Sequence, residues 1–81
     1  MQLEILTPEK ILFKGDVLSV HLPGNVSPFT VLRNHAPLMS LLDVGRIVWS
    51  NENGESGGVD ISGGFVEVKN NRIVACVEPV L

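Results

Sequence analysis

The sequence is poor in the residues that most often indicate a particular chemistry. It has one cysteine, Cys76, two histidines and no tyrosine, and 19% of its residues are charged. A single cysteine cannot form an internal disulfide, which fits a reducing cytosol. Six lysines and arginines against nine acidic residues give a net charge of -3. The chain therefore lacks the positive surplus that binding to nucleic acid or to an anionic membrane usually needs.

Long apolar runs are absent as well. None approaches the roughly 20 residues of a membrane-spanning helix, so we expect no direct membrane insertion. Residues 1–4 carry no positive charge ahead of an apolar segment, which predicts no signal peptide. A chain of 81 residues that is 44% hydrophobic can form one domain with a modest core. We therefore expect a single soluble, cytosolic domain over residues 1–81.

Short β-prone runs fill most of the chain. Residues 2–7 alternate polar and apolar side chains before Pro8, as a half-buried strand does. Further strands are predicted at residues 11–13, 17–22, 29–32, 44–49, 59–62, 65–69 and 73–78. Turns are predicted at Lys14-Gly15-Asp16 and at Pro23-Gly24-Asn25, and a polar connection at residues 51–58. Closely spaced breaks favour an all-β fold, a two-sheet, mainly antiparallel sandwich.

The alternation also predicts which side chains form the core. They are Leu3, Ile5, Leu18, Val20, Leu22, Ile47, Ile73 and Val77. Gly63-Gly64 indicates a bulge or a close backbone approach, and Asn70-Asn71 suits the positive φ of a tight hairpin. Residues 36–43 could form a helical turn with Asn34 as its N-cap. They are too few for an independent helix, so we interpret them as a strand after a loop.

Candidate catalytic groups do not form a recognisable pattern. Cys76, His35 and Asp43 would be the nucleophile, base and orienting acid, but nothing in the sequence brings them together. Cys76 lies among apolar residues and is interpreted as an inert core thiol. His21 and His35 lack the spacing of metal ligands. We predict no catalytic, cofactor or metal site. His35 is left with two readings of equal weight, a hydrogen bond within its own loop or a contact with a partner.

Several motifs occur in an order that is more specific than any of them alone. They are Leu3-Glu4-Ile5-Leu6-Thr7-Pro8, Gly15-Asp16-Val17, Pro23-Gly24, His35-Ala36-Pro37-Leu38, Gly45-Arg46-Ile47 and Ile61-Ser62-Gly63-Gly64-Phe65-Val66-Glu67-Val68. In this the chain resembles the epsilon subunit of rotary F-type ATP synthases, in its N-terminal β-sandwich domain. Two loops depart from the family pattern. Asn25-Val26-Ser27-Pro28 replaces an acidic, glycine-containing loop, and Arg33-Asn34 replaces the usual Pro-Gly.

The resemblance implies a rotor subunit of the central stalk. Such a subunit has no catalytic site of its own and touches the gamma subunit and the polar loops of the membrane c-ring. It lies peripherally at the cytoplasmic face of the inner (plasma) membrane and couples proton or sodium flow to the larger catalytic complex. The residues that the resemblance places at these contacts are Asn25, Phe29, Arg33, Asn34, His35, Leu38 and Met39. The alternative is a free-standing β-sandwich that binds a peptide or small ligand.

Family members commonly continue into a C-terminal helical hairpin, which can restrain rotation and in some relatives binds ATP. This sequence ends at Leu81, shortly after its last predicted strand. The resemblance therefore implies a coupling and assembly subunit that neither binds ATP specifically nor blocks ATP hydrolysis by helix insertion.

Overall fold

Strands form the regular structure of residues 1–80, the part of the chain that the computed structural model describes. They are β1 (Gln2–Leu6), β2 (Ile11–Asp16), β3 (Ser19–Leu22), β4 (Phe29–Leu32), β5 (Leu38–Leu42), β6 (Gly45–Ser50), β7 (Ser56–Lys69) and β8 (Arg72–Pro79). Within these residues no helix occurs, which confirms the all-β prediction. Residues 36–43 accordingly contain a strand, and the helical alternative with Asn34 as its cap is wrong.

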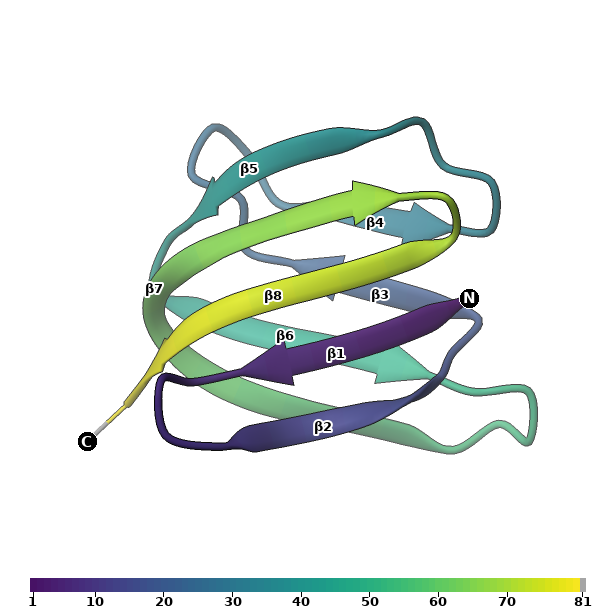
Figure 1. Cartoon of the computed structure of the whole chain (residues 1–81), viewed down its shortest axis with the longest axis horizontal. Helices are drawn as coiled ribbons and strands as arrows, with labels where there is room; N and C mark the ends of the chain where they lie inside the picture. Colours follow the sequence, from purple (N-terminus) through teal and green to yellow (C-terminus); the bar gives the residue numbers. More distant parts are fainter. Residues whose placement is uncertain (81) are drawn as a thin grey trace.

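The strands lie in two facing layers (Figure 1). We call the layer of β2, β1, β8, the C-terminal half of β7 and β5 the front sheet. The N-terminal half of β7, β6, β3 and β4 form the back sheet. β1 and β8 run parallel, and the other strand pairs in residues 1–80 are antiparallel. The predicted, mainly antiparallel sandwich is confirmed.

β7 belongs to both sheets because it bends at Gly63-Gly64. Residues 56–61 pair with β6, pairing with β8 begins at Ile61, and residues 64–68 also pair with β5. The register against β8 shifts between Ile61 and Gly63, which marks a bulge. Gly64 has φ +144°, and a Cβ there would collide with the Cys76 carbonyl oxygen. The bulge and the close approach predicted for this glycine pair are confirmed, although the two strands predicted around it are one.

Apolar side chains from both sheets fill the space between the layers. The buried hydrophobic residues are Leu3, Ile5, Val17, Val20, Leu22, Val31, Leu42, Ile47, Ile61, Val66, Val68, Ile73, Ala75 and Val77. Among residues 1–80 none of the buried side chains is polar or charged. At the margin of this core the rings of Phe13 and Trp49 pack with centroids 4.3 Å apart. An apolar, close-packed interior of this kind resists deformation.

One core prediction is wrong, since Leu18 is 45% exposed while the other seven residues are buried. The turn predicted at Lys14-Gly15-Asp16 is also wrong. β2 continues through these residues, and Gly15 lies opposite Leu3 of β1. The chain turns later, at Val17 and Leu18, so the alternation restarts there and Val17 is buried instead. Periodicity could not show where one strand ended and the next began.

The hairpin between β7 and β8 has the predicted chemistry. Asn70 and Asn71 have φ of 52° and 58°, in the left-handed region that asparagine tolerates. The β6–β7 connection is shorter than predicted, because Ser56, Gly57 and Gly58 already pair with β6. Gly57 lies opposite Trp49, and a Cβ at this position would meet the indole ring. The glycine-rich sequence therefore makes room for an aromatic ring.

Candidate partner-contact surface

The predicted contact residues lie at two opposite ends of the sandwich. Phe29 begins β4 opposite Leu22, and Leu32 ends the strand opposite Ser19. Three residue steps of a strand span about 10 Å. Asn25 and Phe29 therefore lie at one end. Arg33, Asn34 and His35 lie at the other, in the loop of residues 33–37 that joins β4 to β5 (Figure 1). Leu38 and Met39 begin β5 directly after this loop, so five of the seven residues are neighbours.

The β4–β5 loop, residues 33–37, carries the chain from the back sheet to the front sheet. The backbone N–H of His35 donates to the Leu32 carbonyl at 3.1 Å. The half-buried His35 ring places its Nδ1 2.7 Å from the Ala36 carbonyl oxygen. A carbonyl only accepts, so this contact requires the proton on Nδ1. His35 therefore makes the hydrogen bond within its loop that was one of its two predicted roles.

Asn34 connects the loop to the front sheet. Its φ is 64°, so it adopts the left-handed conformation that glycine and asparagine tolerate best. Its backbone N–H donates to Oδ1 of Asn71 at 2.6 Å, and Nδ2 of Asn71 donates to its Oδ1 at 3.0 Å. The Asn71 side chain thus bonds both the backbone N–H and the side-chain oxygen of Asn34, and we call these two hydrogen bonds the amide pair. Sequence reasoning identified each asparagine separately but not their contact, which joins positions 37 residues apart.

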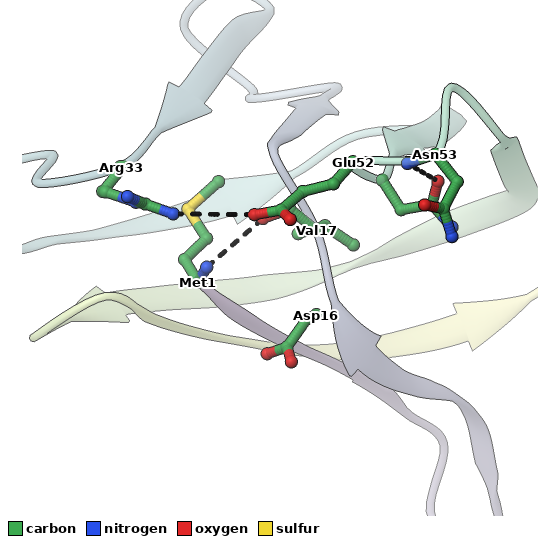
Figure 2. Close-up of a pocket in the computed structure, with 7 residues that line it drawn as sticks. Met1, Asp16, Val17, Arg33, Glu52 and Asn53 are labelled. Atoms are coloured by element: carbon green, nitrogen blue, oxygen red, sulfur yellow. Dashed lines mark hydrogen bonds and ion pairs between the residues drawn. The ribbon is translucent and has the colours of Figure 1, made fainter.

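Arg33 extends from the same loop over a shallow polar pocket (Figure 2). Its guanidinium lies 3.8 Å from Oε1 of Glu52 in the β6–β7 loop, and both side chains are at least 65% exposed. Beside this pair the N-terminal ammonium of Met1 donates to the Val17 carbonyl at 3.3 Å. Exposed ion pairs of this kind contribute little to stability. The Arg33 side chain is therefore available to another molecule at small cost.

Leu38 and Met39 point to opposite faces of the front sheet. Leu38 is half-buried and packs against the core, whereas Met39 is 68% exposed. Near Met39 an apolar row crosses the outer face of this sheet, in which Leu41 pairs with Phe65, Phe65 with Cys76, and Cys76 with Leu6. We call these four residues the outer apolar row. Sequence reasoning missed it, although the alternation in residues 38–42 already placed Leu41 beside Met39.

The end that holds Asn25 and Phe29 contacts the C-terminal end of β5. The Asn25 backbone N–H donates to the Leu41 carbonyl at 3.0 Å, and Gly24 forms a β-bridge with Leu42. The Phe29 ring lies where a Cβ on Gly24 would be, which leaves no room for any side chain at that position. The Phe29 side chain is thus half-buried against Gly24 at this end of the sandwich. Asn25, in contrast, has an exposed side chain.

The residues considered for chemistry are separated by the fold. Asp43 follows β5 at the end opposite His35, and its backbone N–H donates to the Pro23 carbonyl. Cys76 lies between Phe65 and Leu6 on the front sheet and is only partly buried, not in the core. His21 is exposed, with Nδ1 3.0 Å from Oγ1 of Thr30. Within residues 1–80 no three His, Cys, Asp or Glu side chains gather as metal ligands would. No helix in the same residues could span a membrane.

Comparison with known proteins gives the family of this sandwich. The model of the ATP synthase delta/epsilon chain β-sandwich domain matches residues 1–80. ATP synthase epsilon chains from Sulfurovum sp. and Nitratiruptor sp. are 42% and 44% identical over 78 residues, 96% of this chain. The epsilon chain of Chlorobium limicola is 37% identical over 79 residues, 98% of this chain and 90% of its own length. This chain spans only about 60% of the length of the first two relatives.

Solved structures agree on the fold. A chain in the Euglena gracilis mitochondrial ATP synthase structure of OSCP, F1 and c-ring superposes with a TM-score of 0.85. It is 22% identical, and the match covers 93% of this chain and 48% of that one. A chain of the Tetrahymena thermophila central stalk and c-ring gives 0.79 at 18% identity, over 95% and 62%. The family model and the epsilon-chain relatives together show that this chain belongs to the ATP synthase delta/epsilon β-sandwich family.

Proposed function

We propose that this chain acts in the central stalk of an F-type ATP synthase, as the sandwich of an epsilon-type rotor subunit. The observation that carries the proposal is its 37–44% identity to ATP synthase epsilon chains over almost its whole length. In this role it helps to join the gamma subunit to the c-ring, so that ion flow through the membrane drives ATP synthesis at the catalytic subunits. It is a non-catalytic subunit at the cytoplasmic face of the membrane, held there by its partners.

The architecture suits a part that transmits torque. β7 runs through both sheets without interruption, so one strand that is hydrogen-bonded in each sheet joins the layers in addition to apolar packing. The interior of residues 1–80 holds no buried polar side chain that would need water or a partner. Such a core changes shape little under load. A stiff wedge between gamma and the ring is what coupling requires.

The contact surface in this proposal is the end formed by the β4–β5 loop and the start of β5. Arg33 and Met39 are exposed there, and His35 is half-buried with its ring fixed by the Ala36 carbonyl. Loops on a rigid scaffold are common sites of recognition, and arginine, methionine and aromatic residues are enriched at protein interfaces. We assign gamma and the c-ring loops as the molecules that this end meets. We assign Asn25, at the opposite end of the sandwich, as a second point of contact.

Reconstitution tests the proposal directly. ATP synthase stripped of this subunit would be reassembled with the native chain or with the triple variant Arg33→Ala, His35→Ala and Met39→Ala. We expect the native chain to restore assembly and ion-driven ATP synthesis, and the variant to bind at least tenfold more weakly, since truncating an interface anchor costs about 1–4 kcal/mol. Phe29 is left intact because it packs within the fold.

A matched control removes three exposed side chains from another part of the surface. Glu9, Lys10 and Lys14 lie in and beside β2, away from the β4–β5 loop. Their triple alanine variant should assemble and couple like the native chain. A native chain that neither joins the complex nor affects coupling would contradict the rotor assignment and favour a free-standing binding module. Normal assembly of the first triple variant would contradict only the contact surface.

A further inference from the structure

Few bonds hold the β4–β5 loop, although it crosses between the two sheets. Its neighbours β4 and β5 lie at the edges of different sheets, since β4 pairs with β3 and β5 pairs with β7. Arg33, Asn34, Ala36 and Pro37 are exposed, so little burial fixes their positions. The ion pair of Arg33 with Glu52 is long and exposed. The position of the loop on the front sheet therefore depends on the amide pair of Asn34 and Asn71.

Asn71 is well placed to anchor the loop because its own backbone is fixed. Its carbonyl accepts a hydrogen bond from the Gln2 backbone N–H at 2.9 Å, which ties the hairpin to β1. Its side chain then uses both ends of the amide: Oδ1 accepts from the Asn34 N–H, and Nδ2 donates to the Asn34 Oδ1. Asn71 thereby bonds β1 through its backbone carbonyl and the loop through its side chain.

We infer that Asn71 is a positioning residue for partner recognition, which sets the β4–β5 loop in its binding conformation without touching the partner. The inference rests on the proposed function, because it assumes that this loop meets gamma or the c-ring. Without the amide pair the loop samples other positions, and the apparent affinity falls by the fraction of molecules that remain competent to bind. Two neutral hydrogen bonds correspond to about a tenfold loss.

The adjacent residue supplies a matched control. Asn70 has φ 52° in the same hairpin, and none of the hydrogen bonds found within residues 1–80 uses its side chain. Glycine adopts positive φ readily, so Asn70→Gly and Asn71→Gly disturb the hairpin backbone equally little. Only Asn71→Gly removes the amide pair. Asn71→Asp keeps an acceptor for the Asn34 N–H and loses the donor.

The first measurement is amide hydrogen exchange followed by NMR in the whole chain. The Asn34 N–H should be protected in the native chain and in Asn70→Gly, and lose protection in Asn71→Gly. The second is binding to a gamma–c-ring complex that lacks this subunit. Asn71→Gly should bind about tenfold more weakly with only a small fall in its thermal midpoint, Asn71→Asp should be intermediate, and Asn70→Gly should match the native chain.

The outcomes separate this inference from the proposed function. If the native chain does not bind the gamma–c-ring complex, the proposed function is wrong, and the exchange result still decides whether Asn71 fixes the loop. If the native chain binds and Asn71→Gly binds equally well with the Asn34 amide released, positioning by Asn71 is wrong. Equal losses in Asn70→Gly and Asn71→Gly would also overturn it, since they would reflect the hairpin and not the amide pair.

Discussion

The chain passes from the back sheet to the front sheet within β7 and again through the β4–β5 loop, and these two crossings are held very differently. Within β7, Ile61 and Val66 are fully buried on either side of the Gly63-Gly64 bend. Pairing with β8 continues across the bend, with β6 paired before it and β5 after it. The loop instead has exposed residues and a pair of asparagine amides. Rigidity thus comes from the first crossing, while the second presents residues for contact.

The difference follows from what each crossing buries. Removing a buried group leaves a cavity, and the whole sandwich is destabilised. Removing an exposed loop group lets water replace it, so the loss stays local. We therefore expect large global effects from substitutions in β7 and small ones in the loop.

The largest effect is expected from Gly64→Ala. The new Cβ would strike the Cys76 carbonyl oxygen and lie 2.8 Å from the Val77 Cα, at a φ of +144° that side chains rarely adopt. Backbone strain and overpacking together should lower the free energy of unfolding by about 3 kcal/mol or more. Urea denaturation followed by circular dichroism measures it. At Gly63 a Cβ would meet only the Leu42 carbonyl at 3.7 Å, so Gly63→Ala should cost much less. Equal losses of stability in the two variants would show that the bend requires glycine at position 64 no more than at position 63.

A cavity beside the bend should have the next largest effect. Ile61→Ala removes a fully buried side chain and should cost about 2–5 kcal/mol. Ile11→Ala makes the same chemical change in β2, where the side chain is 58% exposed, and should cost less than about 1 kcal/mol. Thermal or urea unfolding of both variants provides the comparison. A small loss at Ile61 would mean that the crossing within β7 is not the rigid part of the molecule.

A moderate effect is expected at Asn34 in the loop. Asn34→Ala places an alanine at φ 64° and removes the Oδ1 that accepts from Asn71, so stability should fall by about 1–2 kcal/mol. Asn34→Gly loses the same acceptor but relieves the backbone, and its loss should be smaller. The difference between their unfolding free energies measures the conformational term. If the two variants were equally stable, the positive φ at this position would carry no cost.

The smallest effect on stability is expected at Arg33. Its contact with Glu52 is exposed on both sides, so Arg33→Ala should change the free energy of unfolding by no more than about 0.5 kcal/mol. A double-mutant cycle with Glu52→Ala isolates the pair, and added salt should leave the result nearly unchanged. A coupling above about 1 kcal/mol would show that the loop is held by this ion pair as well as by Asn71.

Much of the fold could be predicted from local patterns. Alternation identified seven core residues, and the paired glycines and asparagines indicated the bend in β7 and the β7–β8 hairpin. The family was identified from ordered motifs, which no physical argument from spacing would have supplied. Leu18 was misplaced because a strand that continues past Gly15 and a strand that stops there have the same local sequence. Only pairing with β1 distinguishes them.

The candidate surface was less accessible to sequence reasoning. The contact residues stay predictions, and the structure adds that Asn25 and Phe29 lie at a different end from Arg33, Asn34 and His35. The apolar row that contains Leu41 and Phe65 was missed because alternation within one strand does not tell which residues of the neighbouring strands lie beside it. Their row becomes visible only when β5, β7, β8 and β1 are aligned.

The sequence by itself determined the β class, most of the core, the hairpin chemistry and the family, because each depends on periodicity, on the backbone preferences of glycine and asparagine, or on motifs in fixed order. The tertiary structure alone decided that β7 serves both sheets, that Val17 replaces Leu18 in the core, and that Asn34 meets Asn71. These features depend on contacts between residues distant in the chain, and local preference does not specify which distant segments become neighbours.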